Sequence, residues 1–88
     1  MLALFLAALE SDEDRRRFSA LYERYHGKME RIAIGILRDQ RDAEDAVQNA
    51  FLQIIRHFEK VSEIPCEELP FWSISIVKNE ALLLLRKR

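Results

Sequence analysis

The fold is decided by the stretch DAEDAVQNAF, which runs from Asp42 to Phe51. Asp42 is a favourable N-cap residue, and the carboxylates that follow it suit the positive end of a helix dipole. The apolar residues of this stretch and its continuation recur every three or four positions, as in a helix that buries one face. They are Ala43, Val47, Ala50, Phe51, Ile54, Ile55 and Phe58. We therefore expect an amphipathic helix from Asp42 to about Phe58.

The same spacing continues on both sides of this helix. Upstream it predicts a long helix over about 14–37, preceded by a polar joint and a short apolar helix over about 2–10. Downstream, a loop over about 59–69 leads to Pro70, which suits the first turn of a last helix because proline lacks the N–H that would stay unpaired there. That last helix continues to the end of the chain.

The composition agrees with an all-helical protein. Only two glycines and two prolines occur in 88 residues, which is too few for the turns of a sheet. Gly27 and Gly35 lie inside the long helix and either permit a close helix approach or mark a bend. We predict an all-α, compact three- to four-helix bundle with a short N-terminal helix. A single domain spans 1–88, with 1–13 as the N-terminal helix and joint, 14–88 as the core, and no second domain.

Several classes of protein are excluded. The single cysteine, Cys66, cannot form an internal disulfide, which indicates a reducing compartment, and the chain has too few nitrogen and sulfur ligands for a zinc site. The apolar N-terminus lacks the basic residues of a signal peptide, so a cleaved signal is the minor alternative, and it is shorter than a membrane span. We expect a cytoplasmic protein without membrane association, metal or cofactor.

The sequence also contains no arrangement typical of an enzyme, such as a glycine-rich phosphate loop or a nucleophile elbow. His26 and His57 lie on separate predicted helices, and Cys66 lies in the loop. Each is better interpreted as an ordinary surface or boundary residue than as a base, ligand or nucleophile. The carboxylates between Asp42 and Asp45 are better explained by helix capping than by acid–base catalysis, so we do not expect an enzyme.

Charge is unevenly distributed, although the formal net charge is only −1. Residues 39–45 carry four acids and one base, and residues 71–88 carry four bases and one acid. These two poles suggest two partners of opposite charge, one basic and one acidic. Complementation of the helix dipoles explains the same pattern equally well.

The last helix is apolar nearly all round, which is typical of a helix that is covered on more than one side. The N-terminal helix could cover one side, and a partner protein, a second copy or a further domain another. Phe71 and Trp72 beside basic residues could stack on an unpaired base, but burial in the core is the favoured interpretation. Asn79 either bonds a neighbour or faces outward, where it could read a base edge.

Three stretches together resemble region 2 of the bacterial sigma-70 family of RNA polymerase sigma factors, and most closely its extracytoplasmic-function group. They are FSALYERY at 18–25 with Ile32-Ala33, DAEDAVQNAF at 42–51, and the last helix from Phe71-Trp72 through IVKN at 76–79 to LLRKR at 84–88. The resemblance covers roughly 10–88. It implies the sigma region 2 fold and a transcription initiation factor that binds the RNA polymerase core and recognises and melts the promoter −10 element.

The resemblance also implies where each partner binds. The middle helix of region 2 docks on the clamp helices of the largest polymerase subunit, which points to Asp45, Gln48, Asn49 and Leu52 on the third helix of this chain as polymerase contacts. The last helix and the loop before it hold the non-template strand of the −10 element. Asn79 is the expected base contact, the loop over 61–69 the pocket for a flipped-out base, and Trp72 a core residue. The expected phosphate contacts are Lys78, Arg86, Lys87 and Arg88.

Some residues depart from the pattern of the family. Ser75 stands where many relatives have Arg, Leu83 stands where many have Asp, and the loop is acidic. These departures support an alternative function, a helical interaction module that associates with polymerase or with itself and has lost promoter recognition. An anti-sigma factor or a second copy, bound to the apolar last helix, is a further expected partner. The family's second domain, which reads the −35 element, is not expected within these residues.

Overall fold

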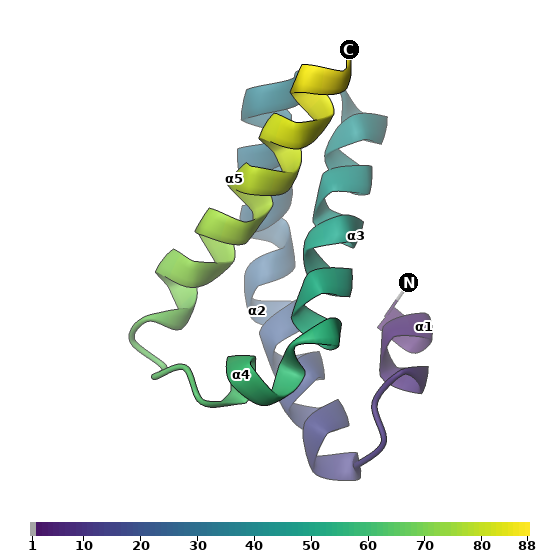
Figure 1. Cartoon of the computed structure of the whole chain (residues 1–88), viewed down its shortest axis with the longest axis vertical. Helices are drawn as coiled ribbons and strands as arrows, with labels where there is room; N and C mark the ends of the chain where they lie inside the picture. The colour runs from purple at the N-terminus through teal and green to yellow at the C-terminus, as the bar shows by residue number, and fades with distance from the viewer. Residues whose placement is uncertain (1) are drawn as a thin grey trace.

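The computed structural model describes residues 2–88, and within them it contains five α-helices and no strand. The three long helices, α2 (Asp12–Leu37), α3 (Gln40–Arg56) and α5 (Leu69–Lys87), lie side by side and form the body of the molecule (Figure 1). The short α1 (Leu2–Ala7) packs on α2 and α3, and α4 (Phe58–Ser62) follows α3 directly. The predicted all-α bundle is therefore confirmed. None of the helices in residues 2–88 combines the length and the hydropathy of a membrane span.

Helix α2 begins and ends at well-defined caps. The Ser11 side chain accepts a hydrogen bond from the Asp14 backbone N–H at 3.0 Å, and three acids occupy the first turn, where the helix dipole favours negative charge. At the other end Arg38 takes the left-handed conformation, with a φ of 53°, and its N–H donates to the Ile34 carbonyl oxygen at 2.7 Å. A left-handed residue reverses the chain quickly. The connection to α3 is therefore very short.

The start of α3 differs from the prediction. Asp39, not Asp42, is the N-cap: its backbone is extended and its side chain accepts from the Asp42 N–H at 2.9 Å. The reason is the left-handed Arg38, because the chain is already redirected at that residue and the next helix can begin at Gln40. Asp42 is freed for another contact, since its carboxylate binds the guanidinium of Arg88.

The end of α3 also differs, since the helix stops at Arg56 and a separate short helix follows. His57 leaves the helical conformation, with a φ of −118°, and α4 covers Phe58 to Ser62, which includes residues predicted as loop. The break turns Phe58 and Val61 inward, where both are buried. The irregular loop is therefore shorter than predicted.

A single hydrophobic core lies between α2, α3 and α5 and is closed by aromatic rings. Phe18 and Phe51 are fully buried with ring centroids 5.8 Å apart, within the range that favours aromatic pairs. Phe5 of α1 completes this group, at 5.7 Å from Phe18 and 6.0 Å from Phe51. The rings of Tyr22 and Phe58 flank it. The six-residue α1 is thus held mainly by one aromatic side chain.

Helix α5 buries only a narrow row of small residues. Ser73, Val77 and Ala81 lie four positions apart, and each is at most 1 % exposed. The Ser73 hydroxyl donates to the Pro70 carbonyl oxygen at 2.9 Å, so its burial leaves no unpaired hydroxyl. The N-terminal helix was a candidate cover for α5, but α1 packs mainly on α2 and α3. Large apolar side chains of α5 therefore stay exposed, namely Phe71, Leu82, Leu83 and Leu85.

The two glycines of α2 are not needed for a close helix approach. Helix α2 passes through both without interruption. A Cβ atom at Gly27 would meet only the Arg31 side chain at an ordinary 3.7 Å, and one at Gly35 would meet nothing within 4 Å. No close helix contact and no break therefore depends on either residue.

Candidate functional site

The outer face of α3 carries a row of exposed side chains opposite the core. Asp45, Asn49 and Leu52 are exposed, and Leu52 keeps 44 % of its surface in contact with solvent. Ala46 and Ala50, one position from Asp45 and Asn49, are fully buried, so the outward direction of this row is fixed by the packing of α3. We call Asp45, Asn49 and Leu52 the α3 row.

Gln48 lies at the edge of the α3 row rather than within it. It is half-buried and lines a small cavity of about 190 Å³ between α2 and α3, together with Phe5 of α1. Three of the four predicted polymerase contacts are thus exposed to solvent, and the fourth, Gln48, is half-buried. Chemically, the α3 row offers a carboxylate, an amide and an aliphatic group, which suits a protein surface with basic groups and an apolar contact point.

The outer face of α5 presents the predicted nucleic-acid contacts. Lys78 and Asn79 are exposed halfway along the helix, and Arg86 and Lys87 are exposed in its last turn. Asn79 therefore takes the second of its two alternatives and faces outward. Phe71 is 74 % exposed, so burial in the core, the favoured interpretation of this residue, is wrong. Its ring is available for stacking, whereas Trp72 packs against the core as predicted.

Arg88 takes a different position from the other basic residues. Its Nη1 donates to the Leu37 carbonyl oxygen at 2.8 Å, and its Nε donates to Oδ2 of Asp42 at 3.1 Å. The guanidinium thus donates hydrogen bonds both to the last carbonyl group of α2 and to a carboxylate in the first turn of α3. Its donors already have partners within the chain, which makes Arg88 a less suitable phosphate contact than Arg86 or Lys87.

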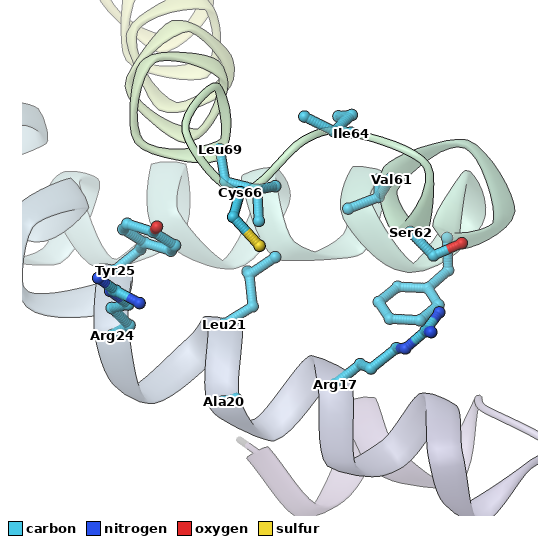
Figure 2. Close-up of a pocket in the computed structure, with 11 residues that line it drawn as sticks. Arg17, Ala20, Leu21, Arg24, Tyr25, Val61, Ser62, Ile64, Cys66 and Leu69 are labelled. Carbon is cyan, nitrogen blue, oxygen red and sulfur yellow. The ribbon is translucent and has the colours of Figure 1, made fainter.

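The loop after α4 forms one wall of a cavity, and the first half of α2 forms the other (Figure 2). The cavity encloses about 340 Å³, near the lower end of ligand pockets at about 300–1,000 Å³. Val61, Ile64 and Leu69 line it on one side and Leu21 on the other, and the Cys66 side chain points toward Leu21. The sequence placed a pocket at this loop, and the structure has a cavity there.

Two residues of this cavity were not expected from the sequence. Arg17 and Arg24 lie two helical turns apart on α2, on the side that faces the loop, and both line the cavity. The loop acids Glu63, Glu67 and Glu68 do not line it, so the charged groups of the wall are cationic. The seven-residue spacing of the two arginines around the apolar Leu21 was the signal available in the sequence. Without a known position for the loop it could not be interpreted.

The other titratable candidates have structural roles. The His26 ring stacks on Tyr22 at 4.8 Å, and its Nδ1 lies 2.8 Å from the Tyr22 carbonyl oxygen. His57 lies at the break between α3 and α4. Among residues 2–88, histidine, cysteine and carboxylate side chains form no group that could bind a metal ion.

The comparisons with known proteins agree with this geometry. The family model described as Sigma-70 region 2 matches residues 21–88, which is most of the chain. The chain belongs to the sigma-70 family. The matched span contains all of α3, α4 and α5, while α1 and the first part of α2 precede it. No curated protein and no solved structure matches the chain.

Membership of this family establishes the general role of the chain. Sigma-70 region 2 is a non-enzymatic domain of a transcription initiation factor, and it takes part in RNA polymerase binding and promoter recognition. The all-α architecture is consistent with that fold. The assignment to the extracytoplasmic-function group stays a prediction.

Proposed function

We propose that this chain binds the clamp helices of the RNA polymerase core through α3 and holds the non-template strand of the promoter −10 element through α5 and the cavity. The observation that carries this proposal is the cavity between α2 and the loop after α4. Its apolar walls suit the faces of a nucleobase, and its two guanidiniums suit the adjacent phosphates. Arg24 has no ion pair within residues 2–88, whereas Arg17 pairs with Glu13 at 3.2 Å on the surface and has to exchange that carboxylate for a phosphate. Transcription places this activity in the cytoplasm.

The positions of the residues indicate which partner each of them contacts. The α3 row, with Gln48 at its edge, meets polymerase, while Asn79 reads a base edge and Lys78, Arg86 and Lys87 contact phosphates. The exposed ring of Phe71 supplies a stacking surface. A base that enters the cavity has to be unstacked first, and this costs a few kcal/mol. The base therefore has to recover this cost through its contacts with the cavity walls. Binding of the flipped-out base in the cavity keeps the two promoter strands apart, and this is how the −10 element is melted.

A binding measurement with the chain assembled on core polymerase tests the role of the cavity. Anisotropy of a labelled −10 single strand should show weaker binding for Arg17→Ala and Arg24→Ala than for the unmodified chain. The salt dependence should also become less steep, by about 0.7 in log–log slope for each phosphate contact removed. Arg16→Ala is the matched control, because Arg16 is exposed and adjacent but does not line the cavity. Equal losses for Arg16→Ala and Arg17→Ala would contradict the proposal.

The second candidate function is an interaction module that has lost promoter recognition. It is favoured by the leucines that α5 leaves exposed, Leu82, Leu83 and Leu85, and by the acidic loop, which repels phosphate. The two functions differ in one outcome of the same measurement. A chain that assembles on polymerase but adds no affinity for the −10 strand at low salt supports the interaction module.

A further inference from the structure

The exposed face of α5 carries a regular seam. Phe71, Ser75, Lys78, Leu82 and Leu85 are all exposed and alternate in steps of four and three residues. That alternation is the a/d spacing of a two-stranded coiled coil. We call these five residues the α5 seam. Nothing in residues 2–88 packs over it, because α5 contacts α2 and α3 through the opposite row of Ser73, Val77 and Ala81.

The two ends of α5 carry opposite charges. Glu67 and Glu68 are exposed just before the helix begins, and Arg86 and Lys87 are exposed in its last turn. The ion pairs found within residues 2–88 involve none of these four side chains. Two such helices repel when they lie parallel, since like charges then meet at both ends. They attract when they lie antiparallel, since each acidic end then meets a basic end.

We propose that the α5 seam pairs antiparallel with the α5 seam of a second copy of this chain. One register pairs Phe71 with a leucine and brings opposite charges together at the ends, where Leu85 lies opposite Glu68. It sets Phe71 of one copy against Leu82 of the other, and Ser75 against Lys78. The same register brings Glu68 to the last turn of the second helix, where Arg86 lies. Phe71 and Leu82 of the two copies, and the opposite charges at the ends of the helices, therefore meet in a single arrangement.

The central pair is compatible with this register. Lys78 faces the small Ser75 of the second copy rather than a second lysine, so its aliphatic stem packs over the seam while the ammonium group reaches solvent. A single pair of helices buries less surface than a stable dimer interface, which is about 1,600 Å². Self-association is therefore weak, reversible and sensitive to salt. It rests on the exposed residues of α5 and not on the proposed function in transcription.

Sedimentation velocity of the isolated chain, from micromolar to millimolar concentration, measures this association without polymerase or DNA. The unmodified chain should form dimers in that range, and Leu82→Glu should remain monomeric. Leu83→Glu is the matched control, because Leu83 is similarly exposed, at 47 % against 40 %, but lies outside the seam. It should dimerise like the unmodified chain. A monomeric unmodified chain at all concentrations would leave the seam to another protein and overturn the proposal. Equal loss in both variants would overturn the register.

Disulfide trapping tests the orientation of the two helices. Phe71→Cys and Leu82→Cys chains, each also carrying Cys66→Ser, are mixed and oxidised. The antiparallel register predicts a covalent dimer in the mixture and little in either chain alone, since residues 71 of the two copies lie at opposite ends of the pair. The remaining Phe71–Leu82 contact of the mixed pair stays intact. A Phe71→Cys chain that links to itself as readily as it links to the Leu82→Cys chain would indicate a parallel pair and overturn the proposal.

Discussion

Arg88 binds Asp42, 46 residues away in the sequence, and so joins the end of α5 to the first turn of α3. The same guanidinium donates to the Leu37 carbonyl oxygen, which otherwise lacks a partner at the end of α2. Three helices thus meet at one side chain. This contact joins the end of α5 to the connection between α2 and α3.

Removal of either partner should reduce stability. Both side chains keep more than a third of their surface exposed, so Asp42→Ala should cost only about 0.5–1 kcal/mol. Arg88→Ala should cost somewhat more, since it also leaves the Leu37 carbonyl oxygen without its donor. Urea unfolding of both single variants and of the double variant gives the coupling free energy between Asp42 and Arg88. Arg86→Ala, an exposed neighbour in the same turn, should be nearly neutral. Additive losses in the double variant would contradict direct coupling.

The left-handed backbone of Arg38 predicts a stabilising substitution. A residue with a side chain pays about 1 kcal/mol or more in that conformation, whereas glycine adopts it freely. Arg38→Gly should therefore raise the free energy of unfolding by about 0.5–1 kcal/mol. Arg38→Ala removes the same guanidinium but keeps the Cβ atom, so it should bring no comparable gain. Thermal and urea unfolding distinguish the two variants. If alanine stabilises as much as glycine, the effect comes from the lost charge and not from the backbone.

Both glycines of α2 should accept alanine with a gain in stability. The Cβ atom fits at either position, and alanine is favoured over glycine inside a helix by about 1 kcal/mol. Gly35→Ala adds its methyl group in open space, so it should approach the full value. Gly27→Ala meets the Arg31 side chain and should gain slightly less. The double variant should be close to additive, since the sites are distant. A loss of stability at Gly35 would show that α2 needs glycine for a reason other than packing.

The proposed binding of polymerase through the α3 row predicts a selective loss of affinity on substitution. Asp45→Ala with Leu52→Ala removes a charge and an apolar contact from the α3 row while leaving the buried face of α3 intact. Capture of the polymerase clamp helices should fall at least tenfold, because exposed side chains at the centre of an interface carry most of its affinity. Asp45→Ala with Gln48→Ala should also weaken capture. Glu44→Ala removes the same charge beside the row and should have little effect. Unchanged capture by both double variants would contradict the assignment.

The sequence was most informative where one residue pattern predicts both a helix and the face of it that is buried. The apolar spacing around DAEDAVQNAF predicted α3 and its buried face, because a helix that buries one face has to repeat every three or four residues. The caps were less predictable. Asp39 and Asp42 are both good N-cap residues, and the choice between them depends on the left-handed Arg38, which no residue preference indicates.

The break after α3 and the cavity depend on contacts between distant segments. Helix α3 stops at Arg56 and α4 begins at Phe58, and no residue preference at His57 indicates this break. Arg17 and Arg24 line the cavity only because the loop after α4 returns to α2. The exposure of Phe71 was mispredicted for a related reason. The inner row of α5 consists of small residues, and the aromatic ring lies outside it.

The position of α1 matters for anyone who expresses this domain. The family match begins at residue 21, yet Phe5 and Phe18 precede it and both pack on Phe51. A protein trimmed to the matched span would lose the rings of Phe5 and Phe18 and expose the Phe51 ring to water. Such a fragment should aggregate or bind hydrophobic dyes even though every recognisable motif is present. The span that the family model matches is therefore shorter than the span that a folded, soluble sample of this domain needs.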